Sequence, residues 1–436
     1  MAEFITTIVA LVLCFITFKN YNKGACLSYL SSVYLIPGHA NVFGGIRFKF
    51  VVLGAMIVSA IINKIKVRTG NVLVKPAIFY FLYGLILAIL SSYVPLTTQF
   101  PYLIKQWIYL FLFGILLWPA LRTEFNVRYF LKFLYWALLF STLMGILEYI
   151  MSMNLFREFF GSNSEIMFFD DERLGMAGRI CVASSHPLDS GQCCIILLGA
   201  SFLLFRDFLS QKKSIILFSL LIINCVLTGS RSSIFPIIIL AALNILLYMK
   251  DRLRKYVWSV AIIFVGFVAV LNSIDSSMKE SVMGIMMPWS SDAGKEANVG
   301  GSSVELREKQ MENSLYFIGD KNLWVGMGYG LVHNRKEGDG DLFENAHGLE
   351  SVVFVTVIEQ GIVGLICFFI FYIFLYFSSL KYTQDCHIKI ILFFLFLCYM
   401  ISLLMTGIRS SMQLFFTMLV VFLRYEYIHN PLFEKR

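Results

Sequence analysis

The chain has 436 residues, of which 58% are hydrophobic and only 15% are charged, and it contains 42 Phe and 21 Tyr. Soluble globular proteins contain about 45–50% apolar and about 25% charged residues, so this composition excludes a water-soluble globular protein and indicates a membrane protein. The formal net charge of +8 does not indicate a nucleic-acid partner, because the basic residues cluster in short loops, where they orient membrane helices.

Apolar segments follow one another along the chain, beginning with Met1–Phe18, which we interpret as a first helix and not as a cleaved signal peptide. The segment 25–36 is apolar but short, and it predicts either half a span or one further helix. With about 20 apolar residues per span, the pattern predicts an all-α polytopic membrane protein with about 12 transmembrane helices, in a range of about 11–14. The predicted spans are 4–18, 49–63, 77–95, 103–121, 130–151, 190–206, 214–229, 232–249, 256–273, 351–378, 388–406 and 412–428.

Loops rich in Lys and Arg alternate with loops that are poor in them, such as Ser91–Pro101. Short cytoplasmic loops carry the excess of positive charge, so the rich set predicts the cytoplasmic side and places the C-terminal end there. The uncertain segment 25–36 leaves the side of the N-terminal end open. The rich set comprises Lys64, Lys66, Arg68, Arg122, Arg128, Lys132, Arg206, Lys212, Lys213, Lys250, Arg252, Arg254, Lys255, Arg424, Lys435 and Arg436.

Two long loops fall on the predicted outer, periplasmic face, near 152–192 and over 272–348. They divide the chain into N-terminal transmembrane helices (1–271), a large periplasmic loop (272–348) and C-terminal transmembrane helices (349–436). Long loops without secondary structure are uncommon, and the spacing of apolar residues in Glu305–Phe317 predicts a short amphipathic helix there.

Several arginines lie on the outer side, against the charge trend of the short loops. Arg231 stands in Thr-Gly-Ser-Arg-Ser-Ser between two apolar segments, and Arg409 repeats the pattern at another outer turn. A cation so close to the membrane is costly and needs a partner, and the guanidinium group matches phosphate oxygens. Arg173 and Arg179 in the first outer loop and Arg307 in the second complete the predicted anion-binding set. Snorkelling to lipid head groups is the alternative explanation for these arginines.

His347 closes the large loop at the mouth of the next helix, where a residue that exchanges protons near neutral pH suits a general base. Glu350, His186 and His333 are secondary candidates. Asp339 and Asp341 invite a magnesium interpretation, but a solvated acidic turn is the favoured one, and no metal or cofactor is expected. Glu148 and Glu359 are interpreted as interfacial groups near helix ends.

Across residues 170–411 this pattern resembles the O-antigen polymerase and O-antigen ligase superfamily. The resemblance lies in Leu-Thr-Gly-Ser-Arg231-Ser-Ser, in a large outer loop where Arg307 precedes Gly326-Met-Gly328-Tyr-Gly330, in His347, and in Glu359-Gln-Gly361-Ile-Val-Gly364. The family often has Asn directly after the histidine, whereas this chain has Gly348. The distance from His347 to Glu359 is also longer than usual in the family.

The resemblance implies an inverting, metal-independent glycosyltransferase of the bacterial inner membrane. Its donor is a glycan on undecaprenyl pyrophosphate, Arg231 and Arg307 hold the pyrophosphate, and His347 activates the acceptor hydroxyl. Expected partners are the undecaprenyl-pyrophosphate-linked oligosaccharide, membrane lipids and a chain-length regulator protein. Gly348 and the divergent, Phe-rich sequence favour a polymerase over a ligase that moves the glycan to lipid A core. A flippase or transporter is the alternative of another class, and it predicts charged groups near the bilayer midplane.

Overall fold

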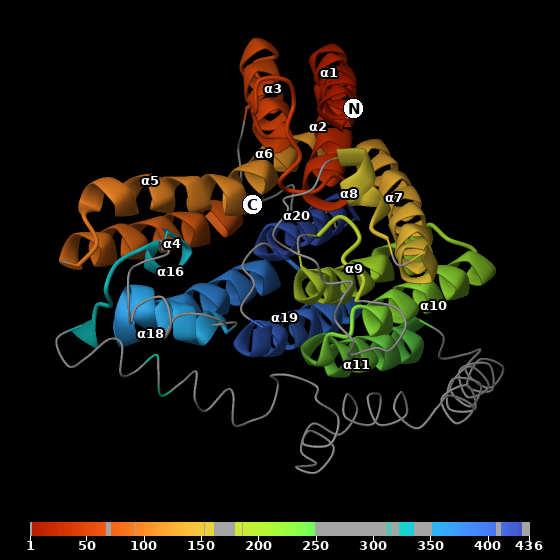
Figure 1. The fold of residues 1–436 in the computed structure, drawn as a ribbon. Helices are drawn as coiled ribbons and strands as arrows, with labels where there is room; N and C mark the ends of the chain where they lie inside the picture. The colour runs from red at the N-terminus through yellow and green to blue at the C-terminus, as the bar shows by residue number, and fades with distance from the viewer. Residues whose placement is uncertain are drawn as a thin grey trace. The chain divides into compact units, whose positions relative to one another are not determined.

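The computed structural model describes residues 2–66, 71–91, 93–151, 153–160, 179–184, 186–248, 312, 314, 322–334, 351–406 and 411–429. In these ranges the chain is helical (Figure 1), and the only pairing of β type is an isolated bridge between Asn41 and Arg47. The predicted all-α polytopic membrane fold is therefore confirmed.

Each predicted apolar segment in the described ranges is helical, and the largest differences are at the starts of α4, α5 and α7, which begin before the predicted residues 77, 103 and 130. Among the described residues, seven helical stretches are long and apolar enough to cross a membrane, and Phe48–Ile62 and Ser232–Asn244 are shorter apolar helices. The predicted span 256–273 lies outside the described residues, as does most of the predicted helix 305–317, of which Glu312 and Ser314 are helical. The helices are α1 (Ala2–Lys19), α2 (Tyr21–Leu30), η1 (Ser31–Leu35), α3 (Phe48–Ile62), α4 (Asn71–Leu90), α5 (Leu96–Trp107), η2 (Ile108–Leu112), α6 (Phe113–Ala120), α7 (Glu124–Met151), α8 (Leu155–Phe160), α9 (Pro187–Asp207), α10 (Gln211–Leu227), α11 (Arg231–Tyr248), α16 (Leu331–Asn334), α18 (Val352–Lys381), α19 (Cys386–Thr406) and α20 (Ser411–His429).

Two compact units are built from interleaved parts of the chain. Unit 1 draws on residues 1–10, 30–49 and 131–306, and unit 2 draws on 11–29, 50–130 and 307–436. Each unit therefore combines N-terminal and later segments. The division of the sequence into two sets of transmembrane helices and a large periplasmic loop stays a prediction.

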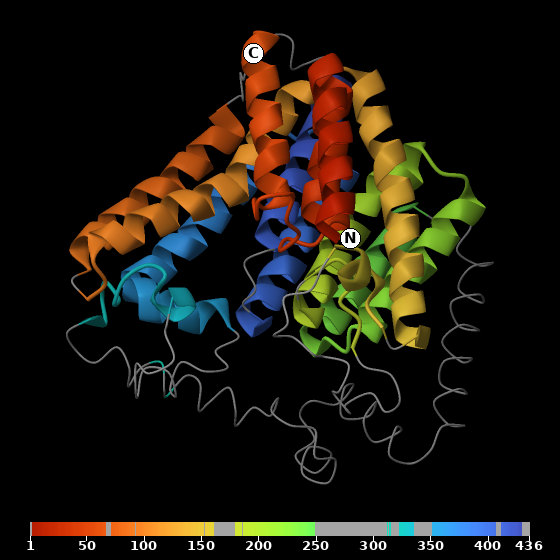
Figure 2. The same ribbon diagram turned by 45° about the horizontal axis from the view of Figure 1, so that its top comes forward.

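In unit 1, helix α9 packs against both α10 and α11, and the three lie side by side in both views (Figures 1 and 2). Gly191 permits this approach, since a Cβ atom there would stand 2.6 Å from the Ser233 hydroxyl oxygen and 2.9 Å from the Ser230 Cβ. The end of α10, the start of α11 and the start of α9 thus meet in one place.

The segment 25–36, whose role the sequence left open, forms the second half of α2 and the whole of η1. Together α2 and η1 fold back along α1. The Thr17 and Ser28 hydroxyl oxygens are 3.0 Å apart, although eleven residues of one straight helix would separate them by about 16 Å. The Ser59 hydroxyl donates to the Thr17 carbonyl at 2.8 Å, and the Phe43 N–H donates to the Thr7 hydroxyl at 2.9 Å. Helices α1 and α3 therefore run parallel, with α2 and η1 as the return segment.

In unit 2, α4 packs against α5 and α18, and α20 packs against α6. Aromatic rings fill the core, where the Phe111 centroid lies 5.3 Å from that of Tyr80 and 4.8 Å from that of Phe416.

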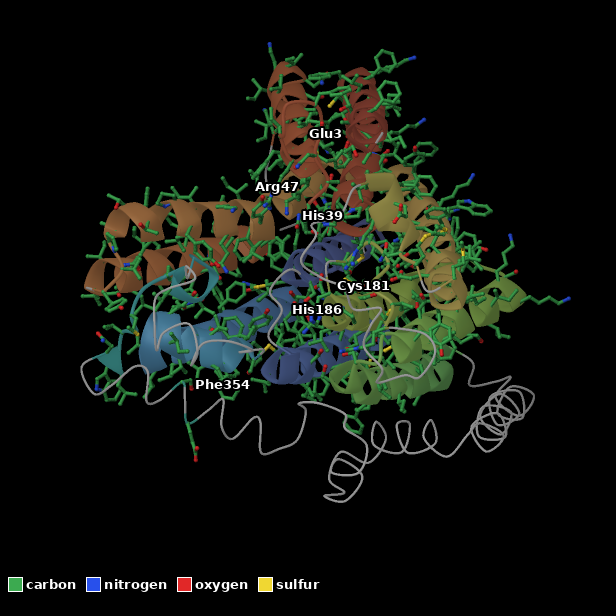
Figure 3. All side chains as sticks on the ribbon, in the orientation of Figure 1. Glu3, His39, Arg47, Cys181, His186 and Phe354 are labelled. Atoms are coloured by element: carbon green, nitrogen blue, oxygen red, sulfur yellow. The ribbon has the colours of Figure 1, made fainter. Side chains whose placement is uncertain are left out.

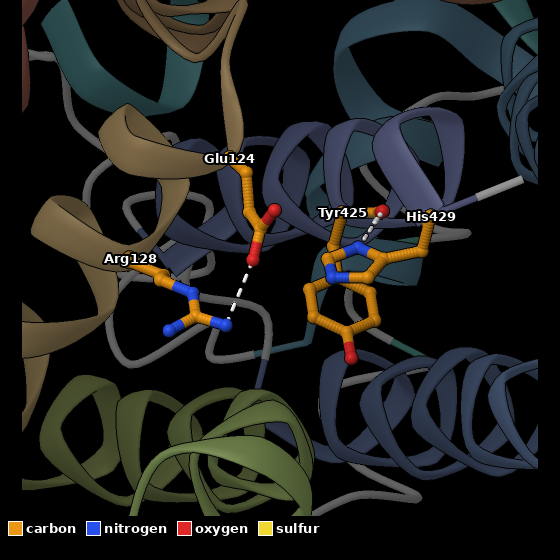
Figure 4. A network of polar contacts seen from close by, with 4 residues as sticks. All are labelled: Glu124, Arg128, Tyr425 and His429. Atoms are coloured by element: carbon orange, nitrogen blue, oxygen red, sulfur yellow. Dashed lines mark hydrogen bonds and ion pairs between the residues drawn. The ribbon is translucent and has the colours of Figure 1, made fainter.

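The C-terminal part of α20 contacts α6 and the residues that precede α19 in unit 2. Arg424 lies over the Trp118 ring at 4.2 Å and donates to the Trp118 carbonyl at 2.9 Å. Glu426 accepts the N–H groups of Gln384 and Asp385 at 2.7 and 2.9 Å. The same helix ends with the His429 ring stacked on Tyr425 (Figure 4).

Figure 4 also shows an ion pair on α7, where Arg128 lies 2.8 Å from Glu124 one helical turn away. Both side chains are largely exposed, and exposed pairs of this kind contribute little to stability.

Candidate functional site

The turn between α10 and α11 brings one predicted arginine to a helix start. Gly229 adopts a left-handed conformation (φ +60°) that ends α10. The Ser230 backbone carbonyl then accepts hydrogen bonds from the N–H groups of Ser233 and Ile234. Arg231 is the first residue of α11. The N-terminal end of a helix carries unpaired N–H groups and a partial positive charge, both of which favour an anion.

Arg179 docks onto the same turn from the first outer loop. Its side chain is 6% exposed, its Nε donates to the Thr228 carbonyl at 2.9 Å, and its Nη2 lies 3.5 Å from the Gly229 carbonyl. A guanidinium group is favourable there because the last carbonyls of α10 carry partial negative charge. Two of the predicted anion-binding arginines, Arg179 and Arg231, thus converge on one turn although 49 residues separate Arg179 from Thr228.

A buried carboxylate holds the segment that carries Arg179. Glu148, near the end of α7, is 1% exposed, so its interpretation as an interfacial group was wrong. It accepts the N–H groups of Cys181 and Val182, both at 2.8 Å. Sequence reasoning missed this residue because its partners are backbone groups 33 and 34 residues further on.

His186 caps the start of α9. Its Nδ1 accepts the Leu188 N–H at 3.1 Å, and the helix begins at Pro187. Figure 3 shows His186 and Cys181 near this end of α9. The structure therefore gives His186, a secondary catalytic candidate, a helix-capping role.

In unit 2, the glycine-rich segment 322–330 interlocks with a break in α18. The break is at Gly361, whose φ of 67° and ψ of −171° are not helical. The Met327 and Gly328 N–H groups donate to the carbonyls of residues 358 and 359, at 2.8 and 3.0 Å. In return, the N–H groups of residues 362 and 363 donate to the carbonyls of residues 323 and 324, at 3.0 and 3.1 Å.

Glycine is required on both sides of this interlock. A Cβ atom on Gly326 would stand 2.3 Å from the Gln360 backbone nitrogen, and one on Gly361 would stand 2.4 Å from the Trp324 carbonyl oxygen. Close backbone approach therefore explains why glycine stands at both positions, since Gly326 and Gly361 lie against each other's segments.

Glu359 and Gln99 fix the rest of this segment. The Glu359 carboxylate, 1% exposed, accepts the Val332 N–H at 3.2 Å, so its interpretation as an interfacial group was also wrong. Gln99 of α5 accepts the Tyr329 N–H at 2.9 Å and donates to the Val94 carbonyl at 2.6 Å. Together they place the short helix α16, on which His333 lies.

The remaining predicted site residues lie outside the described residues. They are Arg173, Arg307, Arg409, His347 and Glu350, together with Asp339 and Asp341. Their roles stay predictions. Within the described ranges, no group of three or more His, Cys, Asp and Glu side chains is arranged to hold a metal ion.

Comparison with known families gives one match, and no curated protein matches the chain. Residues 216–369 match the sequence model of the family described as O-antigen ligase. The matched region begins in α10, includes the turn at Arg231 and the glycine-rich segment, and ends in α18 beyond Gly361. Arg179 and Glu148 lie outside it. The chain is thus a multi-pass membrane protein, and its residues 216–369 are similar to the O-antigen ligase family, which supports the resemblance to the O-antigen polymerase and ligase superfamily.

Proposed function

We propose that the protein is a polymerase of O-antigen or a related surface polysaccharide. It transfers a growing glycan from undecaprenyl pyrophosphate to another lipid-linked repeat unit. The enzyme lies in the bacterial inner membrane, and its active site faces the periplasm. The glycosyltransferase character of the superfamily supports the reaction class, and the Lys- and Arg-rich loops on the opposite side support the orientation.

The observation that carries the proposal is the convergence of Arg179 and Arg231 on the start of an 18-residue apolar helix. Arg179 is bonded to backbone carbonyls of the turn, and Arg231, a cation between two apolar segments in a membrane, is costly without an anionic partner. The pyrophosphate of a lipid carrier supplies one, because its isoprenoid tail stays in the bilayer while its charge reaches the outer turn.

The proposed reaction uses the arginines and the histidine of the predicted site. The bond between the anomeric carbon and the pyrophosphate oxygen breaks, and the negative charge that develops on the leaving group is stabilised by Arg231, Arg179 and Arg307. His347 takes the proton of the acceptor hydroxyl, whose oxygen forms the new glycosidic bond. Attack from the side opposite the leaving group inverts the anomeric centre, and the protein's own cations neutralise the pyrophosphate.

A ligase that transfers the glycan to lipid A core is the second candidate, favoured by the description of the matching family. A deletion strain separates the two on a lipopolysaccharide gel. Loss of the ladder with one repeat unit retained indicates a polymerase. Loss of all O-antigen, with lipid-linked polymer accumulating, indicates a ligase.

Two point variants test the site. Arg231→Ala and His347→Ala are each expected to reproduce the deletion phenotype at wild-type protein level, because losing one charge-stabilising group costs about 10²–10³ in rate and losing a general base costs about 10²–10⁴. Arg128→Ala is the matched control, since its guanidinium lies in an exposed ion pair. Normal ladders from both site variants would refute this assignment of the site.

A further inference from the structure

We propose that Glu148 is a positioning residue of this enzyme. Its carboxylate fixes the segment 179–182, and this segment in turn fixes the α10–α11 turn at which Arg231 begins. The inference rests on the proposed function, because it assigns to Glu148 the placement of the arginines that hold the pyrophosphate.

The carboxylate sits in a pocket of backbone donors. Its Oε1 accepts the Cys181 N–H at 2.8 Å and the Asn154 side-chain amide at 3.0 Å, and its Oε2 accepts the Val182 N–H at 2.8 Å. Consecutive N–H groups that point the same way form an anion-binding concavity. Here the anion is supplied by the protein itself, and it is buried.

The conformation of Val182 shows how tightly the segment is held. Its φ of 54° lies in the left-handed region, which is unfavourable for a β-branched residue. Such a conformation persists only where the surroundings impose it, and it is typical of functional sites. Both backbone groups of Val182 are bonded, the N–H to Glu148 and the carbonyl to the Asn154 amide at 3.0 Å.

The other edge of the same segment is bonded to the end of α10. The Ile180 N–H donates to the Leu227 carbonyl at 3.2 Å, and Arg179 donates to the Thr228 carbonyl at 2.9 Å. Residues 179–182 therefore link α7 to the turn. Residues 179 and 180 are bonded to the end of α10, and residues 181 and 182 are bonded to Glu148 of α7. No unbonded residue lies between Glu148 and the turn in this segment, so we expect a displacement of the Glu148 carboxylate to displace the turn as well.

An acid is required at position 148 because donor groups face both of its oxygens. Glutamine has nearly the same shape but only one acceptor oxygen, so its amide N–H₂ would oppose the N–H of Cys181 or Val182. Glu148→Gln therefore changes this interaction with little change in volume. Glu158, exposed on α8, provides the same substitution as a control.

The test measures transfer by purified full-length protein, with undecaprenyl-pyrophosphate-linked repeat units extracted from the deletion strain as substrate. Glu148→Gln is expected to raise the KM for this donor and to lower kcat/KM by about 10- to 100-fold, as misplacement of a binding group does. Glu158→Gln is expected to match the wild type. A role in folding alone would lower the amount of active enzyme and leave KM unchanged.

A second measurement, the labelling rate of Cys181, reports directly whether the segment 179–182 is held in place. The Cys181 thiol is buried, burial raises its pKa, and the thiolate is the reactive form. In a Cys386→Ser background, labelling of Cys181 by N-ethylmaleimide, read by mass spectrometry, is expected to be faster in Glu148→Gln than in Glu158→Gln. If Glu148→Gln does not accumulate, Asn154→Ala loosens the same bonds.

The outcomes separate the two proposals. Wild-type KM and wild-type Cys181 labelling in Glu148→Gln would overturn the positioning role, while an inactive Arg231→Ala in the same assay would leave the proposed function standing. Normal transfer by Arg231→Ala would remove the proposed function itself. A raised KM in Glu148→Gln, with Glu158→Gln unchanged, supports both.

Discussion

Two buried acids, Glu148 and Glu359, hold the backbone at two places that the apolar pattern of the sequence does not indicate. Glu148 and Glu359 look like ordinary acids near helix ends, yet both are buried and bonded to backbone N–H groups. The sequence cannot pair them with their partners, because Cys181 and Val332 are 33 and 27 residues away. The arginine at the start of α11 was predictable, because a lone cation between two apolar runs is visible in the sequence itself.

Gly361 gives a prediction at this scale. Gly361→Ala is expected to lower the thermal unfolding temperature of the purified protein, because φ 67° with ψ −171° is a conformation essentially restricted to glycine that costs other residues about 1–3 kcal/mol, and the alanine Cβ would also meet the Trp324 carbonyl. Gly54→Ala is the control, since no atom lies within 4 Å of a Cβ at that helical position. A Gly361→Ala protein as stable as the wild type would contradict the interlock.

At the scale of elements, most helices were predictable because charged loops bound uncharged apolar runs. Two departures have local causes. Helix α18 was predicted as one span, because Gly361 interrupts the helical conformation without interrupting the apolar run. The helix predicted to begin at 103 begins at Leu96, because Gln99 is a polar residue buried by bonding to Val94 and Tyr329.

The return of α2 along α1 is a prediction that cross-linking can check. In a background without the native cysteines, Thr17→Cys paired with Ser28→Cys is expected to form a disulfide on mild oxidation, because the native hydroxyl oxygens are 3.0 Å apart. Phe15→Cys paired with Ser28→Cys is the control, as Phe15 is 66% exposed. Mass spectrometry distinguishes the two. An unlinked first pair would indicate one continuous helix.

For the whole molecule, the sequence shows which loops share a side of the membrane but not which segments share a compact unit. Loop charge is local and can be read directly. The interleaving of units 1 and 2 depends on contacts between distant segments, such as Tyr329 with Gln99, 230 residues apart. The side of the N-terminal end stayed open because the short segment 25–36 does not show in the sequence whether it crosses the membrane.

The parallel course of α1 and α3 now predicts that side. Lys64 and Lys66 follow α3 in the Lys- and Arg-rich set, so the opposite end of α3 and the start of α1 are expected in the periplasm. In intact cells, Ile46→Cys should react with a membrane-impermeant maleimide and Lys66→Cys should not. The native Cys386, which is exposed, should react only after permeabilisation. Protection of Ile46→Cys in intact cells would reverse the assigned topology.

The interlock at Gly361 also constrains how this chain can be recombined with related chains. Segment 323–328 supplies hydrogen-bond partners that the broken helix would otherwise lack in the lipid phase. The glycine-rich segment 322–330 can therefore not be exchanged independently of α18. A chimera between related chains has to inherit both from a single parent to keep these hydrogen bonds.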